Sequence, residues 1–536
     1  MSTAESAPPS GAIPGLETSE RGLGSRAQRL ALATVCVVLF LTFLDNTIVS
    51  VALGGIQSDL HASVESLQWV VNGYALAFAS LMLAAGMLGD LIGRKKVMLG
   101  GVLVFCGGSV LAALAPNVDV LIAARVVMGV GAAASEPGTL SILRHVYPAR
   151  TSRADAIGIW GAVSAFALAM GPVIGGVLTG FGSWRTIFWF NLGLGLVALV
   201  LALFFVPENS DPSGRRFDVP GVLFGVTALA CLSTAVIQGE TSGYGAPGII
   251  ALYTVAFVAA VAFVVTEARS RFPVLELGYL RRPTFVGANF VAFVAYFGTF
   301  SIFFFAALYL EVVVNASPYS VALDFLPMAA GMIIASVLTG PWVARRGPRE
   351  PMVIGCLLAG AGILATSAVL SPTVTFGDVG WTLAVAGIGF GMALVPVSSS
   401  ALTVVRPERS GMASSATNTS RELGAVIGVA VLGSIVNSKL TGQLAERLKA
   451  IGIPPKFQDL VISAVTQGGL PSGGSSSTKS SNAAVQKTIN EVISAAYGAF
   501  GSGLHIALEL SGALILLGGV VAFATIARER GQVYGL

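Results

Sequence analysis

The sequence predicts an all-α polytopic membrane protein made of two six-helix bundles with two further helices inserted between them. Of its 536 residues, 54% are hydrophobic and only 11% are charged, whereas a soluble chain carries roughly a quarter charged residues. Apolar segments long enough to span a bilayer recur along almost the whole chain. A glycine- and arginine-rich connection also recurs once in each half, which indicates two related bundles.

Fourteen apolar segments are long enough to cross a bilayer as helices. Residues 1–26, which precede the first of them, are rich in Ser, Pro and Gly and lack the pattern of a secretory signal. We expect a disordered cytoplasmic tail there. The expected spans are residues 28–53, 65–89, 97–115, 119–142, 156–181, 186–206, 218–239, 248–267, 284–311, 320–343, 352–370, 378–402, 412–437 and 499–527.

The Lys and Arg residues of the short connections lie almost all on one predicted side of the membrane. The short connections of the opposite side contain only Arg185. Because cytoplasmic connections carry the excess of basic residues, we expect both termini to be cytoplasmic, with residues 528–536 as a second tail. The formal net charge of +4 reflects this bias, and no nucleic-acid partner is expected.

The two halves are expected to be repeats. The segment GMLGDLIGRKK (86–96) follows the second span, and GPWVARRGPRE (340–350) follows the tenth. If spans 9–14 repeat spans 1–6, spans 7 and 8 form an inserted pair, and parallel six-helix repeats are a known transporter layout. The expected domains are an amino-terminal bundle of residues 27–206, a linker of residues 207–283 with the two inserted spans, and a carboxy-terminal bundle of residues 284–527.

The one long connection on the outer side, residues 438–498, has a helical pattern of its own. Apolar residues recur at helical spacing on both sides of the flexible segment GGLPSGGSSST (468–478). We expect two amphipathic helices lying against the outer surface, either as a cover or as part of a gate. The apolar residues are Leu440, Leu444, Leu448, Ile451, Val485, Ile489, Val492 and Ala496.

The segment GMLGDLIGRKKVML (86–99) resembles the cytoplasmic loop signature of the major facilitator superfamily. Its glycines allow a tight turn between closely packed helices. The resemblance implies the major facilitator fold and a contact that holds the two bundles together in one state of alternating access. Ala344 replaces the aspartate in the second-half copy, so the contact is expected on one side only. The residues implied are Gly86, Asp90, Gly93 and Arg94.

Two further segments resemble motifs of the same superfamily. LIAARVVMGVGAA (121–133) resembles its fourth-span motif and contains Arg125. GPVIGG (171–176) resembles a fifth-span signature associated with antiporters, in which the glycines allow close helix contact and the proline permits a bend. The residues implied here are Gly171, Pro172, Gly175 and Gly176.

FLDNTIVSVAL (43–53) resembles the first-span motif of the fourteen-span drug:proton antiporters, the QacA/EmrB-like multidrug exporters. WVVNGYALAFAS (69–80) and SWRTIFWFN (183–191) lie where that family has similar stretches. The resemblance covers nearly the whole chain outside the termini and the long outer connection. It implies export of drugs by exchange for protons.

Asp45 lies inside the first apolar span, where a carboxylate is costly unless it faces a protein interior or a water-filled cavity. The predicted topology places Asp45 and Arg125 in the same half of the membrane depth, so the two side chains can face one another. A carboxylate held between a stabilising arginine and a desolvating interior can bind and release a proton. We therefore expect Asp45 to carry or gate the coupled proton and Arg125 to tune it; the alternative is a polar contact that only joins two helices.

Other polar residues in the spans are candidates to line a substrate cavity. Glu136, in ASEPGTL (134–140), is expected either to bind a cation or to accompany the bend at the following proline. Asp324 is a cation contact or an interfacial residue. Asn72 is a further candidate. Tyr296 is included because aromatic rings bind flat lipophilic cations; the alternative is that the aromatic residues of the ninth span face lipid. Arg421 matches an arginine of the resembled family and is expected to be conformational.

The sequence indicates a secondary transporter and no enzyme. It contains no GxxxxGK[ST], HExxH or GxSxG motif, so we expect no catalytic residue, metal or cofactor, and a proton gradient as the energy source. The leading hypothesis is a proton-coupled antiporter of the bacterial inner membrane that exports lipophilic or cationic compounds and functions as a monomer in the lipid bilayer. The alternatives are a dedicated exporter of one natural product and a membrane receptor without transport.

Overall fold

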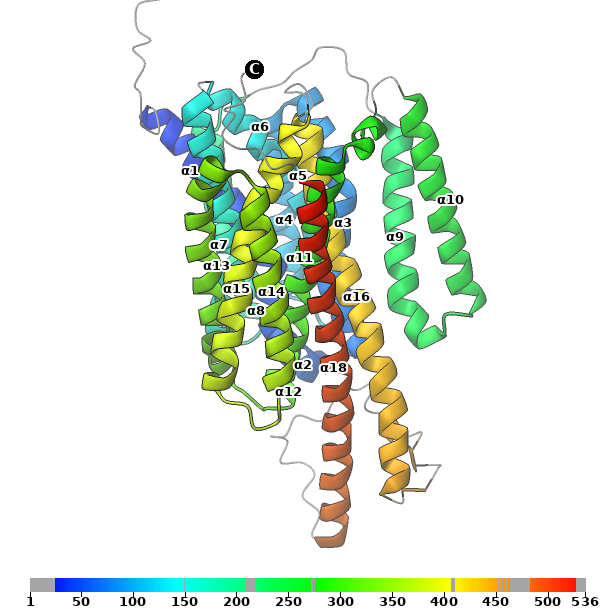
Figure 1. Ribbon diagram of the computed structural model, residues 1–536. Helices are drawn as coiled ribbons and strands as arrows, with labels where there is room; N and C mark the ends of the chain where they lie inside the picture. Colours follow the sequence, from blue (N-terminus) through cyan, green and yellow to red (C-terminus); the bar gives the residue numbers. More distant parts are fainter. Residues whose placement is uncertain are drawn as a thin grey trace, which may run out of the picture.

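The computed structural model describes residues 25–148, 150–208, 218–270, 273, 275–405, 410–451, 453–454, 457–458, 461–462 and 483–526. Every regular element in that part of the chain is helical (Figure 1), so the prediction of an all-α protein is confirmed. The predicted tail 528–536, and all but the last two residues of the predicted tail 1–26, lie outside the described residues.

The first half of the chain forms a bundle whose helices follow the expected spans with small shifts at their ends. The third and fifth expected spans, for example, begin a few residues earlier than predicted. The elements are α1 (Arg26–Ile48), the 3-10 helix η1 (Val49–Ala52), α2 (Leu53–Leu60), α3 (Val64–Ile92), α4 (Arg94–Ala113), α5 (Val118–Ser135), α6 (Pro137–Val146), α7 (Arg150–Phe181) and α8 (Arg185–Phe205).

The rest of the chain contains the inserted pair and a second bundle. The inserted pair is α9 (Val219–Ser242) and α10 (Pro247–Arg269). The second bundle follows the short helix η2 (Leu277–Arg281). Its elements are α11 (Pro283–Ser301), the π-helix η3 (Ile302–Ala306), α12 (Ala307–Val312), α13 (Pro318–Arg346), α14 (Arg349–Val369), α15 (Phe376–Thr403), α16 (Ser410–Ala450) and α18 (Ala483–Thr525).

Local sequence explains where many of these helices begin. A helix leaves its first backbone N–H groups without partners, and a Ser or Asn side chain at the N-cap can accept from them. Ser63, Asn117 and Ser317 do so at the starts of α3, α5 and α13. Ser25 goes further, because it forms a reciprocal capping box with Gln28 at the start of α1.

Thirteen helices of the described residues are long and apolar enough to cross a membrane. They include both inserted helices and the expected first, ninth and fourteenth spans. The expected second span coincides with α3, a 29-residue helix that is not among the thirteen. The prediction of a multi-pass membrane protein is therefore supported, whereas the count of fourteen spans stays a prediction.

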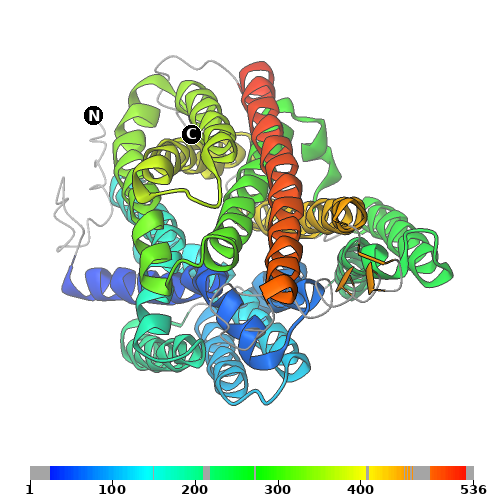
Figure 2. The same cartoon turned by 90° about the horizontal axis from the view of Figure 1, so that it is seen from below.

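The two bundles use the same internal contacts. In the first, α3 and α4 both pack on α5; in the second, α13 and α14 both pack on α15. The bundles meet where α7 packs against α13 and where α3 packs against α16. The inserted pair stands at the side of the molecule, where α9 contacts α3 and α16 (Figures 1 and 2). Any path between the bundles is therefore bounded by α3, α7, α13 and α16.

Three of the expected spans are interrupted rather than continuous. The first passes through η1, the ninth passes through η3, and the fourth breaks at Glu136, where Pro137 begins α6. Proline removes a backbone donor, which accounts for the break in the fourth span. η1 and η3 lie in corresponding spans of the two halves and contact each other. Non-helical backbone at membrane depth is tolerated where protein buries it.

The two surface helices expected in residues 438–498 are wrong as separate elements. α16 continues without a break to Ala450, and α18 begins at Ala483, so both helices project beyond the bundle as a two-helix arm (Figure 1). Leu440, Leu444 and Leu448 are buried on α16. Extending a helix costs less than nucleating a new one, and no proline interrupts residues 410–450. We call the end of the bundle that bears this arm the arm end, and the opposite end the tail end.

The glycines of GPVIGG let α7 approach two neighbours closely. A Cβ added at Gly171 or Gly175 would overlap Thr47 or the Ile48 carbonyl oxygen of α1, respectively. A Cβ at Gly176 would overlap the Pro318 carbonyl oxygen of α13, in the other bundle. Small residues at such crossings are typical of membrane helix packing. Pro172 lies inside α7, which continues past it.

We predict that Gly175→Ala destabilises the protein by about 1–3 kcal/mol, because the new methyl group overpacks the contact between α7 and α1. The matched control is Gly161→Ala on the same helix, where a Cβ would meet nothing within 4 Å. Thermal unfolding of the detergent-solubilised protein compares the two. Equal melting temperatures for both variants would show that the close contact is not required.

Candidate functional site

Asp45 and Arg125 form an ion pair in the interior of the first bundle. The Arg125 Nη1 atom lies 2.5 Å from the Asp45 Oδ2 atom, and both residues are 0% exposed. Asp45 comes from α1 and Arg125 from α5. The structure thus brings together the two residues that the sequence places in the same half of the membrane depth.

Three neighbours hold this pair in place. Asn191 of α8 donates its amide to the other Asp45 carboxylate oxygen at 2.6 Å. Arg125 Nε donates to the Val70 carbonyl oxygen at 3.0 Å, and its guanidinium lies 4.5 Å from the centroid of the Tyr74 ring. Tyr74 in turn donates its hydroxyl to the Thr42 carbonyl oxygen. Because both Asp45 oxygens have charged or polar donors, the carboxylate is stabilised away from water.

A second cluster of buried polar groups crosses the boundary between the bundles. Asn46 of α1 donates to the Glu422 carboxylate of α16 at 3.2 Å. In the opposite sense, Asn418 of α16 donates to the Glu136 carboxylate of the first bundle, also at 3.2 Å. All four residues are buried. Asn418 and Glu422 are four residues apart, so one face of α16 provides both contacts.

Arg421 and Tyr296 lie beside this cluster but belong to the second bundle alone. Arg421 donates to the Asn418 side-chain oxygen at 3.3 Å and to the Leu394 carbonyl oxygen at 3.4 Å. Its guanidinium lies 5.7 Å from the centroid of the Tyr296 ring, within the range of a cation–π contact. Tyr296 stacks on Phe300. The arginine therefore places a positive charge near Glu136 and Glu422.

Two of the expected cavity residues have buried polar atoms without a hydrogen-bond partner in the described part of the chain. Neither amide atom of Asn72 on α3 makes a hydrogen bond, and the same is true of the Glu136 Oε2 atom. Both residues are 1% exposed. A buried polar group without a partner costs free energy and calls for an explanation. Binding of a polar or charged ligand is one explanation.

Asp324 stands apart from both clusters. It is half-buried on α13, next to the exposed Leu323. It makes no hydrogen bond or ion pair with the described residues. Its suggested contact with a substrate cation stays a prediction.

The signature segment 86–96 forms the turn between α3 and α4 at the tail end. Gly93 has φ +115°, a conformation that favours glycine, and a Cβ there would meet the Glu208 carboxylate. The Lys95 backbone N–H donates to that carboxylate at 3.2 Å, so the turn is held to the end of α8. Arg94 begins α4.

Gly86, also in this segment, lies close to both bundles. A Cβ added there would come within 3.6 Å of Pro137 on α6 and within 3.8 Å of the Ser415 side chain on α16. The Asp90 side chain lies outside the described residues. Its role in holding the bundles together, like that of Arg94, stays a prediction.

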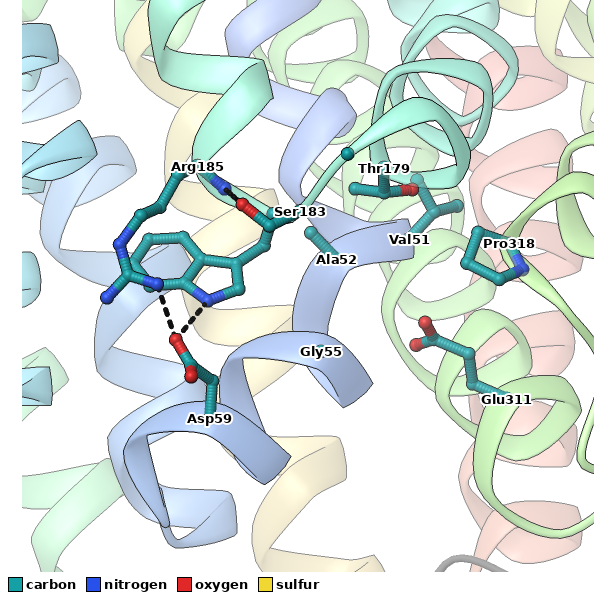
Figure 3. A pocket seen from close by; sticks show the side chains of 11 residues that line it. Val51, Ala52, Gly55, Asp59, Thr179, Ser183, Arg185, Glu311 and Pro318 are labelled. Atoms are coloured by element: carbon teal, nitrogen blue, oxygen red, sulfur yellow. Dashed lines mark hydrogen bonds and ion pairs between the residues drawn. The ribbon is translucent and has the colours of Figure 1, made fainter. Parts of the chain in front are cut away.

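A cavity of about 280 Å³ opens at the arm end between the two bundles (Figure 3). The first bundle lines it from η1, α2, α7 and the start of α8, and the second bundle contributes Glu311 and Pro318. Asp59 accepts hydrogen bonds from Arg185 at 2.5 Å and from Trp184 at 3.0 Å on one side of the cavity. Glu311 lies on the other side. Among the described residues, no group of three or more His, Cys, Asp or Glu could hold a metal ion.

Two repeated helical bundles with buried carboxylates at their boundary define a secondary membrane transporter. The chain belongs to the Major Facilitator Superfamily, whose family model matches residues 35–429. This membership confirms the fold class and identifies the chain as a transporter and not an enzyme.

Named relatives cover most of the chain. It is 34% identical over 441 residues to the Multidrug resistance protein Stp of Mycobacterium tuberculosis, with 82% of each chain covered. It is also 34% identical to the Methylenomycin A resistance protein of Streptomyces coelicolor, over 79% of this chain and 90% of the relative. The Tetracenomycin C resistance and export protein of Streptomyces glaucescens is 29% identical over 98% of this chain and 96% of its own.

A solved structure supports the fold. The crystal structure of a bacterial homolog to the human lysosomal transporter Spinster, in an inward-facing and occupied conformation, matches with a TM-score of 0.58 and 20% identity. The match covers 94% of this chain and 97% of that one.

Sequence reasoning missed Asn191, Asn418 and Glu422 as parts of the site. Asn191 is the last residue of the segment SWRTIFWFN, and a lone asparagine inside an apolar span is a signal that could have found it. The partners of Glu422 and Glu136 come from the opposite bundle, 376 and 282 residues away in the sequence. No local pattern could have identified these pairings.

We predict that Arg125→Met destabilises the protein by about 3–5 kcal/mol, because it leaves the Asp45 carboxylate buried without its charged partner. Asp45→Asn combined with Arg125→Met removes both charges and is expected to recover much of that loss. Thermal unfolding in detergent measures both. The control is Asp59→Asn, which breaks the exposed pair with Arg185 and is expected to cost at most about 1 kcal/mol. A double variant as unstable as Arg125→Met alone would contradict the pairing argument.

Proposed function

We propose that this protein is a proton-coupled antiporter that exports hydrophobic, cationic drugs or toxic compounds across the bacterial cytoplasmic membrane by alternating access. The observation that carries the proposal is a set of carboxylates buried at membrane depth. Asp45 lies within the first bundle, whereas Glu136 and Glu422 lie where the two bundles meet. Buried ionisable groups in membrane helices commonly mark ion and substrate pathways.

The names of the relatives support export of drugs. They are described as multidrug resistance, antibiotic resistance and export proteins, and the relationship extends over most of both chains. Antibiotics are small molecules, so the substrate class proposed here is a small lipophilic or cationic compound. The proton gradient is the proposed energy source, with no cofactor.

The proposed orientation follows from the basic residues. The arm end faces the outside, and both termini face the cytoplasm, because the short connections of the tail end carry the excess of Lys and Arg. Each chain contains both bundles, so we propose that a monomer in the lipid bilayer is the working unit.

The proposed division of labour follows from the contacts. Asp45, held between Arg125 and Asn191, carries the proton. The Glu136 oxygen and the Asn72 amide that lack protein partners supply contacts for the substrate. Because Asn46–Glu422 and Asn418–Glu136 cross between the bundles, any separation of the bundles at this depth breaks both contacts. A cationic substrate or a proton on either carboxylate would compensate for that loss.

A dedicated exporter of one natural product is the second candidate. Two of the relatives are named for single compounds, methylenomycin A and tetracenomycin C. A panel of compounds that includes neutral and anionic antibiotics as well as cations separates narrow from broad export.

We predict that Asp45→Asn abolishes coupled export. In inside-out vesicles with a respiration-driven pH gradient, ethidium or a quaternary ammonium compound is expected to collapse part of the gradient through the wild-type protein only. The reason is that the asparagine cannot carry a proton. Asp119→Asn, an exposed residue in the first turn of α5, is the control and should behave as the wild type. Equal collapse by the Asp45 variant would remove this residue from the coupling path.

We predict a different effect for Glu136→Gln. The variant keeps the hydrogen bond from Asn418 through an amide oxygen but loses the charge that attracts a cation. Transport of monovalent cations is expected to show a KM raised about tenfold or more, whereas neutral substrates should be little affected. Concentration dependence of uptake into the same vesicles measures this. An unchanged KM for every cation would exclude Glu136 from the substrate site.

A further inference from the structure

Helix α2 begins without a cap from its own part of the chain. Its N-cap residue is Ala52, which has no side chain able to accept a hydrogen bond. The acceptor is supplied by Glu311 of α12, whose Oε2 atom accepts from the Gly54 backbone N–H at 3.0 Å. Because α2 belongs to the first bundle and α12 to the second, this helix cap joins the two bundles.

The position of this contact is as informative as its chemistry. It lies at the arm end, beside the cavity of about 280 Å³ shown in Figure 3. The neighbouring interruptions η1 and η3 also contact each other. In both spans, therefore, a non-α-helical segment immediately precedes the helix that takes part in the cap. The two bundles are fastened together here at points where their helices are already interrupted.

The fit at Gly54 is close. A Cβ added at Gly54 would lie 2.8 Å from the Glu311 carboxylate. Gly54 is in helical conformation and does not need glycine for its backbone angles. Its lack of a side chain instead allows the carboxylate to reach the backbone N–H.

Among the described residues that line the cavity, Glu311 is the carboxylate without a charged partner. Asp59 of α2 also lines the cavity but pairs with Arg185 of α8. η1 and η3 contain no charged residue. Asp324 of α13 does not line the cavity, and His61 follows the far end of α2 and is exposed. The Glu311 carboxylate is stabilised by the Gly54 N–H that donates to it and by the dipole of α2, and that stabilisation depends on its negative charge.

We propose that Glu311 is a latch at the outer mouth and a binding site for an external proton, separate from Asp45. As a carboxylate it caps α2 and holds the bundles closed at the arm end. A proton that reaches it through the cavity removes the charge, weakens the cap and releases the outer mouth. The proposal rests on the alternating access and orientation proposed above, but it concerns the gate and not the substrate.

The experiment measures opening of the outer mouth directly. Val51 lines the cavity and is 0% exposed, so a cysteine there reacts with a membrane-impermeant maleimide only when the mouth opens. Val51→Cys is made in a background with Cys231→Ala, which removes the native cysteine that is partly exposed. Rates are divided by those of Gly377→Cys, an exposed position, which cancels the titration of the thiol itself.

The expected result has two parts. With Glu311→Gln, the normalised labelling rate at neutral pH is expected to rise about tenfold. The reason is that losing one charge-assisted hydrogen bond shifts the equilibrium between the closed and the open outer mouth by about that factor. With Glu311 intact, the rate rises as the external pH falls, and the glutamine variant shows no such rise. Asp59→Asn and His61→Gln are the controls and should keep the pH dependence. A flat pH profile in the wild type, or an unchanged rate in Glu311→Gln, would overturn the proposal.

A pair of substitutions at Gly54 tests the contact independently of charge. Gly54→Ala is expected to raise the labelling rate, because its methyl group pushes against the Glu311 carboxylate. In a Glu311→Ala background the same substitution should add nothing. Additive effects of the two changes would show that Gly54 and Glu311 do not act through one contact, and would contradict the latch.

None of these measurements needs a substrate. If the drug assays fail but labelling behaves as described, the proposed function fails and the latch stands. Labelling from the tail end only, with reagent added to the opposite face, would instead show that the proposed orientation is wrong and would overturn the external proton site.

Discussion

The buried Asp45–Arg125 ion pair is the interaction on which the first bundle depends. In hydrocarbon a charged group cannot turn to water, so each of these two residues must find its partners within the protein. Asp45 takes its partners from α5 and α8, and Arg125 adds the carbonyl oxygen of Val70 on α3. A single pair of charges thereby ties three helices, α3, α5 and α8, to the first span.

Charged side chains make different kinds of contact within a bundle and between the two bundles. The described ion pair at membrane depth lies inside one bundle, and the hydrogen bonds from Arg421 to Asn418 and Leu394 lie inside the other. Between the bundles, the carboxylates of Glu136, Glu422 and Glu311 accept from amide or backbone N–H groups instead. Such contacts are weaker than a buried ion pair of opposite charges. Strong contacts within each bundle and weaker ones between them are what the proposed alternating access requires.

Close approach of the backbone makes these contacts possible. At the crossing of α7 with α1 and α13, the glycines of GPVIGG bring helices close enough that an added methyl group would overlap a carbonyl oxygen or a side chain. The interruptions η1 and η3 add two places where the backbone can adjust. Close packing and a local interruption therefore meet in the first span, and α7 also carries the close contact to α13 across the boundary between the bundles.

The sequence by itself determined the membrane class, the helices and much of their extent, because apolar length and Lys/Arg placement are local properties of a chain in a bilayer. It also indicated that Asp45 and Arg125 lie in the same half of the membrane, because the depth of a residue follows from its position along a span and from the direction of that span. Only the tertiary structure decided that Asn191 completes their site, that Glu136 and Glu422 pair with asparagines of the opposite bundle, and that Glu311 caps α2. It also decided that the predicted surface helices are continuations of α16 and α18. These outcomes depend on which helix faces are brought together by packing, and residues hundreds of positions apart leave no local pattern from which that can be read.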